Sequence, residues 1–245
     1  MIAGIINLSV THCYLLLSDR GYVLVDTGYD WEWDRFKKEL KRFSVRPEQI
    51  EYLLLTHHHD DHVGLINNLL GLNSSIKVVM SIKAKKLLST GKNDHAKGGG
   101  YINRRINAIL KLKKVFDKKW THTFPPYRSK NEDIMIDKDV SLDQIGINIE
   151  GKIIETPGHS IDSISVVLGN GDCIIGDAAA NFLQFAGTKY CIIYVEDIEQ
   201  YYHSWNKIIE AGAKMIFPSH GAPFSVAKLK EYIWKNKKQN MVMID

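Results

Sequence analysis

The chain has little cysteine and no long apolar run. Its cysteines, Cys13, Cys173 and Cys191, are odd in number and form no C-x-x-C pair, so they predict buried thiols in a reducing compartment and not a disulfide framework. No apolar stretch approaches the roughly 18 residues that a membrane-spanning helix needs. No N-terminal segment combines a basic start, an apolar stretch and a small-residue cleavage site. Together these absences predict a cytoplasmic protein.

Length and composition are those of a globular domain. At 245 residues the chain can bury a substantial core. A hydrophobic fraction of 44% and a charged fraction of 24% are ordinary for such a protein. The net charge of +4 and the pI near 8.8 are mildly basic, which suits anionic partners in general. We expect one domain over residues 1–245.

Histidines concentrate in one stretch. Four of the 10 histidines and two aspartates fall within His57–His62, directly after Leu53–Leu55, an apolar run that predicts a buried strand. If the chain leaves that strand extended, the two-residue period places alternate side chains together: His57, His59 and Asp61. Neutral imidazoles with a carboxylate are ligands of zinc, manganese or iron. The stretch predicts a metal site, and the alternative is a polar, histidine-rich surface loop.

Three later motifs also end in residues that can bind a metal. Each is an apolar, β-rich run with a glycine or proline at its end that lets the backbone turn. The metal-competent side chains at these ends are His159, Asp177 and His220. The tight turn Gly169–Asp172 predicts that His159 and Asp177 lie at nearby ends of hairpin-linked segments.

These motifs, with Asp26-Thr27-Gly28 before them, resemble those of the metallo-β-lactamase superfamily, from about residue 13 to about residue 224. The resemblance implies an α/β fold, a four-layer αββα sandwich of two mixed sheets with a dinuclear site along one edge. It also implies two ligand sets. One metal ion would be held by His57, His59 and His159. The other would be held by Asp61, His62 and His220. Asp177 would bridge the two, and Asp26 would orient a ligand from outside.

Such a site implies hydrolysis. Two divalent cations, Zn²⁺ first and Mn²⁺ or Fe as alternatives, lower the pKa of bound water from 15.7 toward about 7 and so supply a nucleophile. Asp61 is expected to hydrogen-bond that nucleophile. The ligand set is similar to that of lactonases and glyoxalase II-type thioesterases, so we expect attack on an ester, lactone or thioester carbonyl of a small molecule. Two alternatives stay open: a phosphodiesterase or nuclease of the same superfamily, and a mononuclear iron member of the oxygenase type.

One position departs from the lactonase pattern. The string Thr156-Pro157-Gly158-His159-Ser160 resembles the quorum-quenching lactonases. Those enzymes carry a tyrosine three residues after the bridging aspartate, where this chain has Ala180. The departure puts lactonase activity in doubt, or it moves the role of the phenol to another residue such as Tyr101 or Tyr190.

Residues 83–130 are the most basic part of the chain. Between Lys83 and Lys119 stand twelve lysines or arginines against two acidic residues, and the segment separates His62 from His159, so we interpret it as an insertion. Its apolar residues approximate one helical face: Ile102, Ile106, Ile109, Leu110, Val115 and Phe116. The helix is either a surface helix with solvated lysines, a partner surface, or a lid that draws anionic or amphiphilic substrates. The lid residues would be Tyr101, Arg104 and Arg105.

Periodicity predicts further elements. Helices are expected over residues 30–43, 63–70, 197–211 and 226–238. Strands are expected over residues 14–17, 22–25, 76–80, 145–149 and 214–217. His122 stands alone in its segment and is interpreted as a surface histidine.

Overall fold

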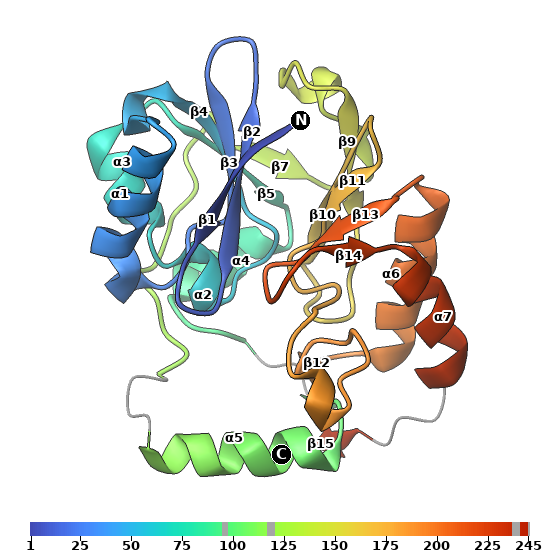
Figure 1. Ribbon diagram of the computed structural model, residues 1–245. Coiled ribbons are helices and arrows are strands. Elements are labelled where there is room, and N and C mark those ends of the chain that lie inside the picture. The colour runs from blue at the N-terminus through green and yellow to red at the C-terminus, as the bar shows by residue number, and fades with distance from the viewer. Residues whose placement is uncertain (95–97, 117–120, 237–240, 245) are drawn as a thin grey trace.

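Two six-stranded β-sheets face each other in the computed structural model of the chain (Figure 1). The structure describes residues 1–94, 98–116, 121–236 and 241–244, without the side chains of residues 114–116 and 234–236. The first sheet contains, in pairing order, β1 (Ile2–Asn7), β2 (His12–Leu17), β3 (Tyr22–Val25), β4 (Ile50–Leu54), β5 (Lys77–Ser81) and β7 (Ile134–Ile136). The second contains β14 (Phe224–Ser225), β13 (Met215–Phe217), β11 (Asp172–Ile174), β10 (Ile164–Leu168), β9 (Gly151–Glu155) and β8 (Val140–Ser141).

The core between the sheets follows from the two-residue period of the strands. In β2, Tyr14 and Leu16 belong to a buried cluster that also contains Ile153 and Val166 of the second sheet. The alternate residue Leu15 faces the outer helices instead. A strand that is apolar on both faces must be covered on both, so each sheet needs a helical layer outside it. The predicted αββα sandwich is therefore confirmed.

Helices cover the two outer faces. On the first sheet lie α1 (Trp33–Arg42), α3 (Ile66–Leu72) and α4 (Ala84–Thr90); on the second lie α6 (Ile198–Glu210) and α7 (Ala227–Asn236) (Figure 1). In α1, Phe36 and Leu40 are buried one turn apart while the charged residues stay outside, which explains why this segment packs as a helix. None of the described helices has both the length and the apolar character needed to cross a bilayer.

A small third sheet lies apart from the sandwich. It pairs β12 (Tyr194–Val195) with β6 (Gly100–Tyr101), and β6 with β15 (Val242–Met243). From β6 the chain enters α5 (Arg104–Phe116), the long helix drawn in green at the bottom of Figure 1. Strand β6, which directly precedes α5, thus pairs with two segments that come much later in the chain, β12 and β15.

The basic segment 83–130 divides into parts with different packing. Its first helix, α4, buries Ala84 and Leu88 among the helices of the first sheet, so that part belongs to the sandwich. The later helix α5 buries Ile106 and Leu110, and the segment before it buries Ile102, in the cluster that contains residues of the second sheet and of α6. Val115 and Phe116, assigned above to the same face, lie outside the described side chains. The limits of the insertion stay a prediction.

Two local expectations were wrong. Residues 145–149 form no strand: a 3-10 turn spans Asp143–Ile145, and Gly146 follows with φ +84°, a conformation that ends a strand pattern. The chain also does not stay extended through residue 61, because helix α2 (Asp60–Val63) begins inside the histidine stretch. The three cysteines are buried thiols, as expected.

Candidate metal centre

The histidine stretch lies where β4 ends. The carboxyl ends of the parallel strands β3, β4 and β5 meet at one edge of the first sheet, and the chain leaves β4 there. His57 and His59 follow in extended backbone, whereas Asp61 and His62 come from the first turn of α2. A helical turn brings neighbouring residues round to one side of the loop more tightly than an extended chain does. The stretch therefore presents four side chains to one place.

Three imidazoles form a first group. The Nε2 atom of His159 lies 3.1 Å from Nε2 of His57 and 2.9 Å from Nδ1 of His59. All three rings are buried. Such separations are close to the about 3.4 Å expected between two nitrogens on one tetrahedral zinc ion. The first group thus has the composition and spacing of a three-nitrogen ligand set.

A second group adds a carboxylate to two imidazoles. Potential ligand atoms of Asp61, His62 and His220 lie within 4.8 Å of one another. The Nε2 atom of His220 is 3.1 Å from Oδ2 of Asp61, and Nε2 of His62 is 3.6 Å from Oδ1 of the same side chain. The hydroxyl of Thr11 donates a hydrogen bond to Asp61 Oδ2 at 3.3 Å.

Asp177 stands between the two groups. Its Oδ2 atom lies 3.5 Å from His159 Nε2, in the first group. Its Oδ1 atom lies 3.3 Å from His220 Nε2 and 3.5 Å from His62 Nε2, in the second. The two oxygens of one carboxylate therefore face different groups, which is the arrangement that a bridging ligand needs.

Hydrogen bonds on the far side of the rings determine which nitrogen points inward. His159 Nδ1 donates to the backbone carbonyl of Tyr194 at 2.9 Å, and His220 Nδ1 donates to that of Val10 at 2.8 Å. A carbonyl oxygen can only accept, so Nδ1 carries the proton. In the neutral ring Nε2 then presents a lone pair.

Asp26 orients one ring in each group. Its Oδ2 atom accepts hydrogen bonds from His62 Nδ1 at 2.8 Å and from the Thr56 hydroxyl at 2.7 Å, and its Oδ1 accepts from the Thr56 amide at 2.8 Å. Because the Thr56 hydroxyl donates its own proton to Asp26, its oxygen accepts a hydrogen bond from His57 Nδ1, which lies 3.1 Å away. Asp26 has φ +61°, a left-handed conformation that aspartate tolerates better than most residues.

The two groups differ in charge. Burial lowers the pKa of His57, His59 and His159, which keeps these rings neutral. Burial also opposes charge on His220, but Asp177 and Asp61 raise its pKa to about 10. Burial likewise disfavours the charged form of Asp61, yet His62 and His220 hold the pKa of that carboxyl below its usual range.

This donor set fits divalent cations. Because His57 Nδ1 and His159 Nδ1 carry the ring protons, two lone pairs face each other across 3.1 Å with no proton between them. In addition, the buried atoms His62 Nε2 and Asp177 Oδ1 make no hydrogen bond to any described residue. Such groups are costly to bury alone, and a cation placed among them would satisfy them all.

A cavity of about 370 Å³ opens onto the two groups. It is lined by His59, Asp61, His159, Asp177 and His220, and by many apolar side chains from α5, the 182–193 segment and the end of the chain. Of the three residues predicted for the lid, Tyr101 lines this cavity, whereas Arg104 and Arg105 are exposed and do not line it. The apolar face of α5 turns inward, so these arginines face solvent. Among the described lining residues, the one lysine or arginine is Lys113.

Sequence reasoning missed several lining residues. His122 reaches the cavity, and its backbone carbonyl accepts from the Asn93 amide at 2.9 Å. Tyr194 lines it too, and burial raises the pKa of its phenol to about 12. No motif marks either residue, because their positions depend on chain segments that meet only in the fold. Tyr190, the other phenol considered, packs against Phe224 and Tyr232 instead.

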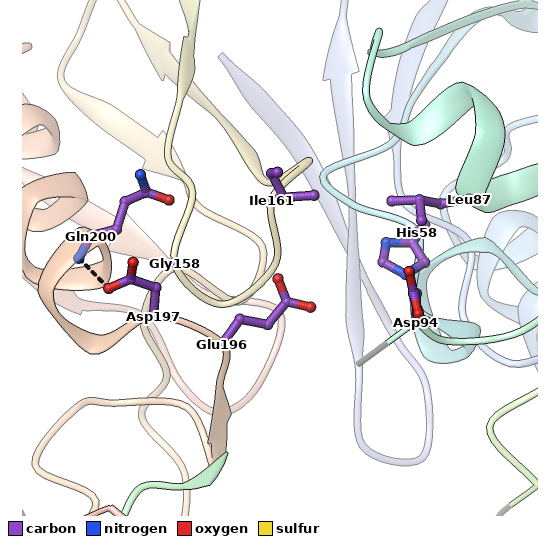
Figure 2. Close-up of a pocket in the computed structure, with 8 residues that line it drawn as sticks. All are labelled: His58, Leu87, Asp94, Gly158, Ile161, Glu196, Asp197 and Gln200. Atoms are coloured by element: carbon purple, nitrogen blue, oxygen red, sulfur yellow. Dashed lines mark hydrogen bonds between the residues drawn. The ribbon is translucent and has the colours of Figure 1, made fainter. Parts of the chain in front are cut away.

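A second cavity, of about 410 Å³, is separate from the ligand atoms. Figure 2 shows His58 and Asp94 on one side of it and Gly158 and Glu196 on the other, and its lining contains none of the seven side chains. His58, the histidine directed away from the site, pairs with a carboxylate instead: its Nδ1 donates to Asp162 Oδ1 at 2.9 Å. This ring therefore links the segment after β4 of the first sheet to the segment before β10 of the second sheet.

Fold and site together define a protein of the metal-binding αββα class, with histidine and aspartate side chains gathered at the edge between two sheets. The family model of the metallo-β-lactamase superfamily matches residues 6–220. The chain belongs to the metallo-β-lactamase superfamily, a hydrolase-like family whose members use divalent metals.

Curated relatives are similar over almost the whole chain. Beta-lactamase-like protein 2 homologs are 26% identical in Caenorhabditis elegans and 24% identical in Drosophila melanogaster, over 98% and 97% of this chain and 66% and 68% of the relatives. A probable metallo-hydrolase of Bacillus subtilis is 22% identical over 86% of this chain and 67% of its own length. The chain thus spans about two thirds of the length of these relatives.

Solved structures share the fold. A subclass B3 metallo-β-lactamase of Bradyrhizobium japonicum is 16% identical with a TM-score of 0.65, covering 96% of this chain and 87% of that one. An archaeal superfamily protein from Sulfolobus tokodaii is 19% identical with a TM-score of 0.60, covering 96% and 84%. At such identities the likeness speaks for the fold alone.

Proposed function

We propose that the chain is a dinuclear metal-dependent hydrolase that acts on the carbonyl of an ester, lactone or thioester. The observation that carries the proposal is the pair of unprotonated nitrogens, His57 Nε2 and His159 Nε2, 3.1 Å apart, with Asp177 between this pair and a second ligand group. His57, His59 and His159 would hold one ion, and Asp61, His62 and His220 the other. Asp177 would bridge them, and Zn²⁺ is the expected metal.

Bound divalent cations supply Lewis-acid activation of water and of the scissile carbonyl. The chain's own residues provide the rest. Asp61 is suited to accept a hydrogen bond from the attacking water or hydroxide, because its carboxylate lies at the cavity wall, where the Thr11 hydroxyl donates to its Oδ2 atom. Asp26 maintains the orientation of His62 and, through Thr56, of His57.

A phenol at the cavity is suited to assist the leaving group. Tyr101 and Tyr194 both line it, with ring centroids 6.4 Å apart. Burial raises the pKa of each phenol, so both hydroxyls stay protonated at neutral pH and can donate a hydrogen bond to a developing alkoxide or thiolate. We assign this role to Tyr101, which compensates for Ala180.

The test combines metal analysis with a substrate panel. Purified protein should contain about two zinc ions per chain and should hydrolyse esters, lactones or thioesters in preference to phosphodiesters and β-lactams. His159→Ala and Asp61→Ala should lower turnover by at least about 10²-fold, since each removes a ligand. The matched controls His203→Ala and Asp34→Ala change exposed side chains and should leave turnover unchanged.

Three outcomes would overturn the proposal. Unchanged turnover in both ligand variants would remove the metal site from the reaction. A single iron per chain with oxygen uptake would favour the oxygenase-type alternative, and a steep fall in substrate affinity with salt would favour a phosphodiesterase.

A further inference from the structure

Beyond the candidate ligands, most side chains that line the cavity at the metal centre are aliphatic or aromatic; the polar exceptions are Asp60, Asn93, Lys113 and His122. Three elements supply most of its aliphatic side chains and one phenyl ring: α5, the segment 182–193 and the end of the described chain. The residues are Ile109, Leu110, Phe182, Leu183, Ile192, Ile193 and Ile244. From this lining we infer that the substrate carries an apolar acyl chain or ring that binds among these residues. The inference rests on the function proposed above and names its substrate class.

Hydrogen bonds hold this apolar wall in place. The amide of Ile102, just before α5, donates to the Ile193 carbonyl at 3.0 Å. The Asn103 side chain donates to the carbonyls of Ala186 and Gly187 at 3.3 and 3.2 Å. The Ile244 amide donates to the Gly99 carbonyl at 3.1 Å. The three elements are thus tied to one another, so the wall is preformed and binding need not order it.

Charge in the cavity argues for a carbonyl compound and against a polyanion. Among the described lining residues, Lys113 is the one lysine or arginine. A phosphate-rich chain requires a row of cations along its path, because each phosphate contact depends on one. The basic side chains Arg104 and Arg105 are exposed elsewhere on α5. An apolar group beside the reacting carbonyl therefore suits this cavity better than a nucleic acid.

The volume suits an acyl group of medium length. A cavity of about 370 Å³ lies within the range of roughly 300 to 1,000 Å³ that holds small-molecule ligands. Burial of one methylene stabilises a complex by about 0.8 kcal/mol, which is about fourfold in an equilibrium or rate constant. In a series of acyl substrates, kcat/KM should rise with each added methylene until the acyl chain fills the cavity.

The experiment measures kcat/KM of metal-loaded protein for acyl thioesters from acetyl to decanoyl. We expect a rise of about tenfold or more between the acetyl and octanoyl compounds. Equal values across the series would overturn the inference while leaving the proposed function intact. Failure to hydrolyse any of them, with the metal bound, would count against the proposed function, and the cavity would then be judged by ligand binding.

Two matched pairs of variants locate the effect. Phe182→Ala and Ile109→Ala truncate residues that line the cavity; Phe185→Ala and Leu112→Ala remove groups of the same size from side chains that are 79% and 64% exposed. The cavity variants should reduce the octanoyl-to-acetyl ratio about tenfold, and the exposed ones should not. The inference would be overturned if Phe182→Ala changed the octanoyl-to-acetyl ratio no more than Phe185→Ala does, and Ile109→Ala no more than Leu112→Ala does.

Binding of octanoate gives a readout that does not depend on turnover. Calorimetry should show that octanoate binds the unmodified protein more tightly than acetate, and that Phe182→Ala weakens octanoate binding whereas Phe185→Ala does not. Equal affinity for octanoate and acetate would overturn the inference even if the chain proves to be an esterase.

Discussion

Asp26 shows how one residue can organise a metal site from behind the ligands: it contacts His62 at Nδ1, on the far side of the ring from the nitrogen that faces the site. It is 1% exposed and accepts three hydrogen bonds, two from Thr56 and one from His62. Through Thr56 it also fixes the proton of His57. A carboxylate behind an imidazole sets the tautomer and raises the basicity of the inward nitrogen.

Asp26→Asn should therefore weaken metal binding about 10- to 100-fold, because the amide cannot accept from Thr56 and His62 in the same way. Competition with a fluorescent zinc chelator measures the change, and circular dichroism reports whether the fold persists. Asp30→Asn changes an exposed aspartate four positions on and should have no effect. An unchanged zinc affinity in folded Asp26→Asn protein would show that the orientation of His57 and His62 does not depend on Asp26.

Tyr101→Phe tests the assignment of the leaving-group donor. Loss of the hydroxyl should lower kcat about 10²-fold with little change in KM, because the hydrogen bond forms as charge develops on the leaving oxygen. Activated esters with good leaving groups should be affected less. Tyr190→Phe is the control, since Tyr190 packs away from the cavity; equal losses in both variants would point to a structural effect.

At the scale of elements, α6 positions two of the candidate ligands, His159 and Asp177. The amides of Glu196 and Asp197, at its N-terminal end, donate to the Gly158 carbonyl at 2.9 Å, beside His159. The buried Tyr201 hydroxyl donates to the Asp177 carbonyl at 3.1 Å. The helix that covers the second sheet thus also sets the backbone from which both candidate ligands project.

Gly158→Ala should disturb this contact. Gly158 has φ +129°, and a β-carbon there would overlap the backbone of Tyr201, which cannot move without α6. We expect a loss of more than about 2 kcal/mol in unfolding free energy and a lower zinc affinity, measured by thermal melting and chelator competition. Gly71→Ala in α3 is the control: a β-carbon added there would meet nothing within 4 Å, so the change should be neutral or stabilising by about 0.5–1 kcal/mol.

At the scale of the whole molecule, the site joins the two halves of the sandwich. The first half supplies His57, His59, Asp61 and His62, and the second supplies His159, Asp177 and His220. Hydrogen bonds also link the halves at this edge: the His12 amide donates to the Ser219 carbonyl at 2.8 Å, and the Tyr14 hydroxyl donates to the Pro218 carbonyl at 2.6 Å. Because its ligands come from both halves, bound metal would act as a clamp between the sheets.

Metal removal should lower the thermal stability of the whole chain. A ligand at about 1,000 times its Kd stabilises the folded state by about 4 kcal/mol, and in a chain of 245 residues each kcal/mol shifts Tm by about 2–4 °C. Differential scanning calorimetry with and without chelator should show a fall of about 8–16 °C. The same treatment should change His159→Ala much less, and an unchanged Tm in the unmodified chain would contradict the clamp.

Local patterns in the sequence determined the elements and the metal-competent side chains. The alternation in β2, the helical spacing of Phe36 and Leu40, and the apolar runs before His57 and His220 are properties of neighbouring residues, so they can be recognised without the fold. The sequence also indicated an αββα architecture, through ordered motifs that resemble a known superfamily. Each of these rests on short-range spacing or on a recognisable string.

Only the tertiary structure decided which side chains line the cavity. Tyr194, His122, Lys113 and Ile244 come from segments with no shared motif, and Arg104 and Arg105 turn to solvent because α5 directs its apolar face inward. Helix α2 likewise begins at Asp60, whose amide donates to Oδ1 of Asn93, 33 positions away, a contact that the prediction of an extended loop could not anticipate. Spacing along a chain fixes which residues share a face of one element, but the direction of that face is set by what the element packs against.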